Sequence, residues 1–379
     1  MNPNVYITVI SKFLPNSPVN NDEMEQYLGL INQRPSLARR IILRSNGIKQ
    51  RYYALDAQGK RTHTNVDLAV NAVQQLCKDG FSVHDIELLS VGTASPEQII
   101  PSHGVMVHGK LGGKNAEVVS FAGSCCTGIQ ALKYAWLALL AGDKNNAVCV
   151  ASERLSPWMQ GRYFEEEAQK LSQLSERPIL AFEKEFLRWM LSDGAAAVLL
   201  QKEPAQGKLS FKIEWIDLCS YAHIRETCMY AGAEKDENGE LHGWTSFPES
   251  EWLSRSIFSL KQDTRQLGEN ITVLGGNFLK EIIEKRNINP DEIDWFLPHL
   301  SSMFFKDKIV EELKRQDYPI PEEKWFINLP WVGNVASASN FLMLEELYHS
   351  GKLKQGQKIL MMTPESARFS YGYCLLTVC

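Results

Sequence analysis

The sequence predicts an α/β protein made of two similar halves. Strand-like runs alternate with helical patterns along the whole chain, an order typical of α/β folds. The strand-like runs are almost continuously apolar, which is typical of a sheet buried on both faces. A chain of 379 residues is also too long for one simple pair of layers. We therefore expect an N-terminal half at residues 1–205 and a C-terminal half at residues 206–379.

The expected strands are runs rich in valine and isoleucine that lie between turn residues. In the first half they are VYITVIS (5–11), IELLSVGT (86–93), AEVVSFA (116–122), NAVCVAS (146–152) and AAAVLLQ (195–201). In the second half they are LSFKIEWID (209–217), IDWFLPH (293–299), KILMMT (358–363) and YGYCLLTV (371–378).

Two further segments have a distinct pattern. A buried helix is expected where apolar residues recur at the i, i+3, i+7 spacing, from Ile129 to Leu140, before Gly142 and Asp143 end it. The segment 154–190 is polar and irregular. We expect it to form a helical insertion at the surface, with a lid or an interface element as the alternative.

Composition excludes several classes of protein. The formal net charge of −5 gives no sign of nucleic-acid binding, which favours a basic surface. No window approaches the roughly 18 apolar residues of a membrane span. The N-terminal segment lacks the cationic start of a signal peptide. The eight cysteines are scattered through apolar runs, so we expect reduced thiols and a cytoplasmic protein.

Two adjacent cysteines precede the helix that ends near residue 140. In GSCCTGI, Cys125 and Cys126 lie at its N-terminus, where unpaired N–H groups and the helix dipole favour an anion. A thiol there is expected to have a lowered pKa and to act as a nucleophile. The alternative is that both are small buried residues, and this stretch alone leaves both interpretations open. A vicinal disulfide or a metal pair is disfavoured, because no matching second motif follows.

Two later residues are suitable partners for such a thiol. His299 ends a predicted strand, and Asn334 lies in a Gly-Asn turn before a helix of small residues. Ligands in α/β proteins bind at strand ends. Each residue alone is more often structural, but together with the thiol they form a candidate Cys-His-Asn site.

The order and setting of these motifs resemble the β-ketoacyl-acyl carrier protein synthase III group of the thiolase superfamily. Its Ala-Cys-x-Gly motif is matched by CCTG, which selects Cys126 rather than Cys125. Its Pro-His-Gln-Ala-Asn motif is matched by PHLSS at His299, and its Gly-Asn-Thr-Ser-Ala-Ala-Ser motif by GNVASAS at Asn334. Weaker similarities, such as SDGAAAVLL, extend the match over nearly the whole chain.

The resemblance implies a thiolase-like fold of two βαβαβ-containing halves in five layers, assembled as a homodimer. It implies an acyltransferase that forms carbon–carbon bonds by Claisen-type condensation of carrier-protein-bound or coenzyme A-bound acyl thioesters. Cys126 would hold the acyl group, and its backbone N–H would stabilise the tetrahedral intermediate. His299 and Asn334 would donate hydrogen bonds to the thioester oxygen of the second substrate. The resemblance implies neither a metal nor an organic cofactor.

The sequence also departs from the family pattern. In the C-terminal loop TPESARFSYG (363–372), Pro364, Glu365 and Arg368 replace small or apolar residues. The tryptophan that stacks on coenzyme A in the family is absent from the matching region, which favours carrier-protein-bound substrates. Ser302 replaces the distal asparagine of the histidine motif.

Within the superfamily, the segments ISKFLPNSPVNNDEMEQYLG and RSNGIKQRYYALD resemble synthases of dialkylresorcinol and flexirubin-type pigment pathways. Such enzymes join a β-ketoacyl thioester to a second, often α,β-unsaturated, acyl thioester and give a cyclohexanedione. Three alternatives are a malonyl-decarboxylating synthase III of fatty acid or polyketide synthesis, an acyltransferase to an alcohol or amine, and a non-catalytic partner subunit. The presence of Cys126, His299 and Asn334 favours condensation.

Overall fold

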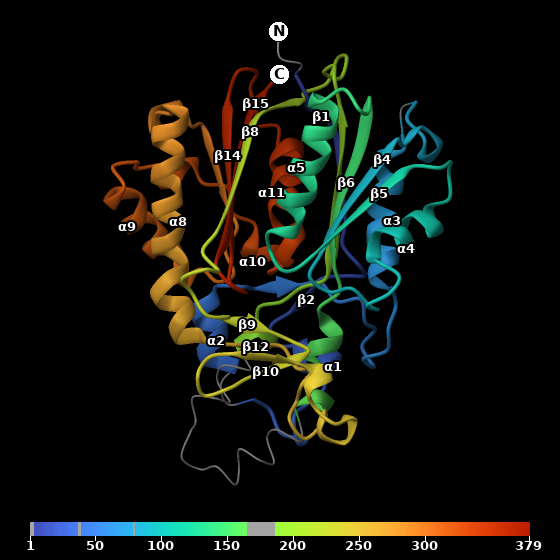
Figure 1. Ribbon diagram of the computed structural model, residues 1–379, viewed down its shortest axis with the longest axis vertical. Helices are drawn as coiled ribbons and strands as arrows, with labels where there is room; N and C mark the ends of the chain where they lie inside the picture. The colour runs from blue at the N-terminus through green and yellow to red at the C-terminus, as the bar shows by residue number, and fades with distance from the viewer. Residues whose placement is uncertain (1–3, 37–38, 79, 165–185) are drawn as a thin grey trace.

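The computed structural model describes residues 4–36, 39–78, 80–164 and 186–379 (Figure 1). Nine strands form one hydrogen-bonded sheet in the order β13-β14-β15-β8-β1-β7-β6-β4-β5. These strands are β1 (Tyr6–Phe13), β4 (Leu88–Thr93), β5 (Glu117–Ala122), β6 (Asn146–Glu153), β7 (Gly194–Gln201), β8 (Phe211–Ser220), β13 (Trp295–Pro298), β14 (Lys358–Glu365) and β15 (Ser370–Val378). Each overlaps one of the nine predicted strands, so the strand predictions are confirmed.

The sheet has two arms. Strands β5, β4, β6, β7 and β1 form the first arm, and β8, β15, β14 and β13 form the second. Only two residue pairs of β1 and β8 join the arms, Tyr6 with Lys212 and Ile7 with Phe211. The strands of each arm come from one half of the sequence, while the division into domains at residues 205 and 206 stays a prediction.

Helices form three layers around the two arms. Helices α5 (Thr127–Leu140) and α11 (Ser339–His349) lie between the arms (Figure 1). Helices α3 (Asn65–Leu76) and α4 (His103–Leu111) cover the outer face of the first arm, and α8 (Thr264–Arg286) and α9 (Phe304–Arg315) cover that of the second. The five layers therefore run α-β-α-β-α, as predicted.

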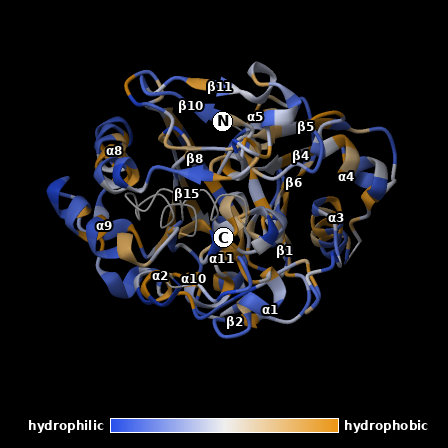
Figure 2. Cartoon of the chain, turned by 90° about the horizontal axis from the view of Figure 1, so that it is seen from below, coloured by the Kyte–Doolittle hydropathy of each residue, from blue (hydrophilic) through white to orange (hydrophobic). Residues whose placement is uncertain are grey.

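The apolar residues follow these layers. One core cluster joins α5 and α11 to both arms through residues such as Ile129, Leu342, Val198 and Leu376. Separate clusters lie beneath α3 and α4 and beneath α8 and α9. Figure 2 shows hydrophilic residues along α8 and α9 at the periphery. The central helices are thus held from both sides, which fixes the start of α5.

Short elements lie beyond one end of the sheet (Figure 1). They are α1 (Met24–Leu28), α2 (Arg39–Asn46), α10 (Leu329–Val332), and the strand pairs β2 (Val19–Asn20) with β3 (Gln50–Arg51), β9 (Met229–Tyr230) with β12 (Lys261–Gln262), and β10 (Ala233–Lys235) with β11 (Leu241–Gly243). Single 3₁₀ turns lie at Val83–Asp85, Ser156–Met159, Gly161–Tyr163, Trp244–Ser246, Glu249–Glu251, Pro290–Glu292, Glu322–Lys324 and Ala336–Ala338.

Three other expectations can be compared with the structure. All eight cysteines are free thiols, as predicted. Within the described ranges, no helix is both long and apolar enough to span a bilayer. Most of the predicted helical insertion at 154–190 lies outside the described residues. Its described beginning contains two 3₁₀ turns rather than an α-helix.

The start of α5 approaches the turn that follows Asn334 very closely. A Cβ atom added to Gly128 would lie 2.2 Å from the carbonyl oxygen of Ser337. No side chain fits such a gap without moving the backbone, so glycine is required at this contact. Gly109 in α4 is the opposite case, since a Cβ there meets nothing within 4 Å.

These two glycines give a matched pair of variants. Gly128→Ala is expected to destabilise the protein by about 1–3 kcal/mol, because overpacking displaces the backbone. Gly109→Ala is expected to leave the free energy of unfolding unchanged or to raise it by up to roughly 1 kcal/mol, because alanine is the better helix former. Urea unfolding measures both. Equal stability of the two variants would show that α5 and the turn are not in close contact.

Candidate active site

The candidate site begins at the N-terminus of α5, where Cys126 is the capping residue. The turn before the helix is closed by Ser124, whose carbonyl oxygen accepts from the backbone N–H of Thr127 at 3.0 Å and from its hydroxyl at 2.9 Å. The predicted place of the two cysteines, at the start of a buried helix, is confirmed.

The surroundings of Cys126 differ from the expectation. Its side chain is fully buried, and its Sγ lies 3.3 Å from the carbonyl oxygen of Thr363. Its backbone N–H donates to Oε2 of Glu365 at 3.3 Å. Burial, followed by the nearby Glu365 carboxyl group, raises the pKa of the Cys126 thiol well above its ordinary value. The predicted lowering of this pKa by the helix terminus is therefore wrong, because burial and a negative neighbour outweigh the dipole.

His299 follows the last residue of β13. Its backbone N–H donates to the carbonyl oxygen of Met362 at 2.8 Å, which ties it to the end of β14 beside Thr363. Burial lowers the pKa of His299 to about 4. The imidazole is therefore neutral near pH 7 and carries one N–H donor. Its buried Nδ1 has no hydrogen-bond partner among the described residues.

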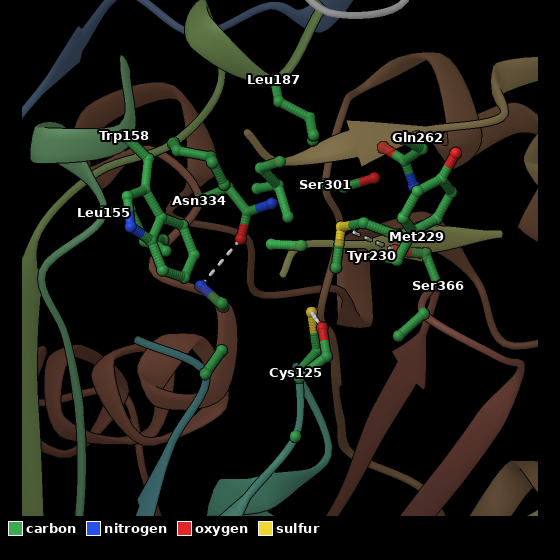
Figure 3. A pocket seen from close by; sticks show the side chains of 18 of the residues that line it. Cys125, Leu155, Trp158, Leu187, Met229, Tyr230, Gln262, Ser301, Asn334 and Ser366 are labelled. Carbon is green, nitrogen blue, oxygen red and sulfur yellow. Dashed lines mark hydrogen bonds between the residues drawn. The ribbon is translucent and has the colours of Figure 1, made fainter. Parts of the chain in front are cut away.

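Asn334 lies in the turn between α10 and the 3₁₀ turn at 336–338. Two backbone hydrogen bonds hold this turn against residues 190–192. The N–H of Asn334 donates to the carbonyl oxygen of Met190, and the carbonyl oxygen of Asn334 accepts from the N–H of Ser192, each at 2.9 Å. Its Oδ1 accepts from the N–H of Ala336 at 2.9 Å (Figure 3). Because the side-chain oxygen is engaged in this way, the Nδ2 group is the one available to donate to a ligand.

Asn340, in the first turn of α11, holds the strand ends together. Its Nδ2 donates to the carbonyl oxygens of Leu297 at 2.9 Å and Met362 at 3.3 Å. Its Oδ1 accepts from the hydroxyl group of Thr363 at 2.8 Å. One buried amide therefore connects β13, β14 and α11 beneath the site. We did not predict this role, although Asn340 lies six residues after Asn334 in the same motif region.

A pocket of about 430 Å³ opens over these residues. It falls in the size range of small-molecule sites. Figure 3 shows Cys125, Asn334 and Ser301 with the apolar side chains of Leu155, Trp158, Leu187 and Met229 around it. His299 also lines it. The structure thus brings Cys125, His299 and Asn334 to one pocket, while Cys126 lies one residue behind Cys125, outside the lining.

The chain is similar in sequence to β-ketoacyl-[acyl-carrier-protein] synthase III enzymes. Residues 283–378 match the family described as 3-oxoacyl-[acyl-carrier-protein (ACP)] synthase III C terminal. The β-ketoacyl-[acyl-carrier-protein] synthase III of Clostridium perfringens is 26% identical over 352 residues, 92% of each chain. That of Chlorobaculum tepidum is 24% identical over 370 residues, 97% of this chain and 96% of its own. The chain is a low-identity relative of the synthase III enzymes.

Solved structures share the fold over the whole chain. AbyA1, a tetronic acid condensing enzyme, is 20% identical with a TM-score of 0.76, covering 98% of this chain and 99% of its own. Xanthomonas campestris OleA with bound lauric acid and lauroyl-CoA is 18% identical with a TM-score of 0.73, covering 100% of both chains. The predicted thiolase-like fold is confirmed. So is the predicted enzyme class, a synthase III-like acyltransferase.

A second buried carboxyl group, which we did not predict, lies under the site. Glu153, at the end of β6, accepts hydrogen bonds from the N–H of Ala94 at 2.9 Å, the hydroxyl of Ser95 at 2.6 Å, and the N–H of Ser337 at 3.3 Å, with a further bond from the Ser337 hydroxyl. It thereby links strand ends of the first half to the turn that carries Asn334. Burial raises the pKa of Glu153 to about 7.

The raised pKa of Glu153 has a testable consequence for stability. Because the folded state binds this proton more tightly than the unfolded state, Glu153 favours folding most at low pH. Its contribution is lost as the pH rises from about 4.5 to about 7. Glu153→Gln is expected to reduce that fall, as measured by urea unfolding across this range. Glu249→Gln, a change at an exposed glutamate, is the control. If the free energy of unfolding of E153Q falls with pH as steeply as that of the wild type, the raised pKa of Glu153 is contradicted.

Possible metal ligands lie elsewhere. Among the described residues, one group of side chains could hold a metal ion. It consists of Asp236, Glu240 and His242, whose ligand atoms lie within 4.8 Å of one another. It lies around the β10–β11 hairpin, and Nε2 of His242 is 3.0 Å from Asp236. None of the three lines the pocket. A reaction without metal or organic cofactor stays a prediction.

Proposed function

We propose that this protein joins two acyl thioesters by Claisen-type condensation through an acyl-enzyme at Cys126. The observation that carries the proposal is the convergence of two neutral donors, His299 and the Nδ2 group of Asn334, on one pocket at the start of α5. Such a pair suits a negative charge that develops on an oxygen atom during the reaction.

The first half-reaction transfers an acyl group to Cys126. The sulfur attacks the thioester carbonyl carbon, the carbon–sulfur bond to the carrier breaks, and the proton of the Cys126 thiol passes to the carrier sulfur, which leaves as a thiol. In the resting structure the Cys126 sulfur contacts Thr363, so acylation requires the side chain to turn towards the pocket. The backbone N–H of Cys126, which donates to Glu365 in the resting structure, would then stabilise the oxyanion of the tetrahedral intermediate.

The second half-reaction forms the carbon–carbon bond. The α-carbon of a second acyl thioester becomes an enolate, and its oxygen accepts hydrogen bonds from His299 and Asn334. The enolate attacks the acyl carbon on Cys126, and the Cys126 thiolate leaves. Donors that are already in place when the charge develops need no rearrangement, which is the source of their catalytic effect.

The lining of the pocket fits acyl chains. Most of its side chains are apolar or aromatic, and no lysine or arginine occurs among the described lining residues. A smaller cavity of about 40 Å³ shares Ile271, His299, Ser301 and Pro364 with it and continues towards α8 and α9. The larger cavity suits an acyl chain that reaches the donors, and the smaller one extends the lined space beyond His299.

The buried Glu365 carboxyl group beside the start of α5 also bears on the choice of the second substrate. Glu365 would repel the free carboxylate of a malonyl group, whereas an acyl thioester without a carboxylate meets no such repulsion. We therefore favour a β-ketoacyl thioester joined to an α,β-unsaturated acyl thioester. The condensation gives a linear 1,3-dicarbonyl thioester. Intramolecular addition of the γ-carbon of the β-ketoacyl chain to the unsaturated β-carbon would then form a second carbon–carbon bond and close the cyclohexanedione precursor of dialkylresorcinols. Carrier-protein-bound substrates and a homodimer remain our expectations.

Product analysis tests this function. A β-ketoacyl thioester and an α,β-unsaturated acyl thioester are incubated with the enzyme, each on coenzyme A and on an acyl carrier protein. A parallel reaction replaces the β-ketoacyl thioester with a malonyl thioester carrying a ¹³C-labelled free carboxylate. We expect a cyclohexanedione in the first reaction, detected by mass spectrometry. Labelled carbon dioxide and a simple β-ketoacyl product in the second reaction alone would favour the decarboxylating synthase instead.

A further inference from the structure

Glu365 is a buried carboxyl group that the mechanism above does not use. It ends β14 and is 9% exposed. Its Oε2 accepts the N–H of Cys126 at 3.3 Å, and the N–H of Ser124 also donates to it. Its chain neighbours Pro364 and Ser366 both line the pocket. The group therefore lies between the start of α5 and the pocket wall.

Among the described residues, no ion pair includes Glu365, so no cation there neutralises this carboxyl group. The groups around it are the thiols of Cys125 and Cys126, whose pKa values it helps to raise. Burial raises the pKa of Glu365 itself. A buried carboxylate that has only two N–H donors and no cation is still costly for folding, so its place beside a reactive thiol points to a role in the chemistry.

We propose that Glu365 is the general base that removes the α-proton of the second acyl thioester. The inference rests on the proposed function, because it concerns the acceptor in the same condensation. A malonyl acceptor needs no base, since its enolate electrons come from the bond to the departing carbon dioxide. An acceptor without a free carboxylate must instead lose a proton from its α-carbon, and the pocket then requires a base.

The Glu365 carboxylate takes the α-proton, and the electrons of the C–H bond form the enolate, whose oxygen is held by His299 and Asn334. The enolate carbon attacks the acyl carbon on Cys126, and the carbon–sulfur bond breaks. The proton on Glu365 then returns to the Cys126 thiolate, so that both groups regain their starting state.

The resting contact explains how the base would be released. The Cys126 N–H that Glu365 now accepts is also a donor suited to the carbonyl oxygen of an acyl group on Cys126. Acylation of Cys126 would replace the carboxylate with that oxygen. Glu365 would then turn towards the pocket only once an acyl-enzyme is present, which orders the two half-reactions.

Glu365→Gln and octanoyl-CoA in deuterium oxide test the proposal. Mass spectrometry follows the acyl-enzyme at Cys126 and the deuterium at the α-carbon of recovered octanoyl-CoA. We expect E365Q to form the acyl-enzyme, while α-deuterium exchange and condensation fall about a hundredfold or more. Glu365→Asp keeps a carboxylate and is expected to recover part of the exchange. Glu345→Gln, a buried glutamate outside the pocket, is the matched control and should exchange like the wild type.

The outcomes separate the two proposals. Exchange in E365Q within threefold of the wild type would overturn the role of Glu365 and leave the condensing function intact. Failure of the wild-type protein to form any acyl-enzyme would instead contradict the proposed function. The acyl-enzyme formed by E365Q also reports that this variant is folded.

Discussion

Cys126→Ala is expected to lower condensation turnover by about a thousandfold or more, because the acyl group loses its covalent attachment. Cys125→Ala is expected to lower turnover by less than about tenfold, since Cys125 would contribute only to the pocket wall. Both changes remove one buried thiol from adjacent positions, so each is a control for the other. Steady-state assays of thiol release measure the difference.

These two variants also decide which cysteine is the nucleophile: Cys126, which the motif selects, or Cys125, which lines the pocket. The motif match selects Cys126, whereas the structure exposes Cys125 to the pocket and turns Cys126 towards Thr363. If Cys125→Ala abolishes turnover and Cys126→Ala does not, the nucleophile is Cys125, and the proposed assignment is wrong.

Asn334→Asp is expected to reduce condensation by about a hundredfold to a thousandfold and to leave acylation of Cys126 within a few fold of the wild type. Aspartate has nearly the same shape and still accepts from the N–H of Ala336, so the turn is kept. It lacks the Nδ2 donor and places a negative charge where the enolate oxygen develops. Single-turnover measurements of acylation and condensation separate the two effects.

Asn289→Asp is the matched control for this change. Asn289 caps the 3₁₀ turn at Pro290–Glu292 and does not line the pocket, and its Oδ1 accepts from the N–H of Asp291. Its replacement should leave both half-reactions unchanged. Equal losses of acylation and condensation in N334D would contradict a role confined to the enolate.

The sequence allowed the prediction of features that depend on local pattern. All nine strands of the large sheet and the buried helix after Cys126 were expected, because apolar runs and i, i+3, i+7 spacing reflect burial directly. The places of His299 and Asn334 were also expected, since both follow recognisable strand and turn patterns and line the pocket.

Features that depend on contacts distant in sequence were missed. The pKa of Cys126 was wrongly predicted because Glu365, which lies 239 positions later, approaches the helix start only in the folded chain. The network of Glu153 likewise joins residues from both halves. A glutamate in a strand end gives no local sign that it will be buried against a turn from the other half.

The central claim is that Cys126 accepts the acyl group, and peptide mapping of the acyl-enzyme tests it most directly. The protein is incubated with saturated, β-keto and α,β-unsaturated acyl thioesters, digested, and the acyl mass is located by fragmentation within the peptide that contains both cysteines. The account predicts an acyl group on Cys126, absent in Cys126→Ala and retained in Cys125→Ala. An acyl group on Cys125, or no acylation by any donor, would contradict it.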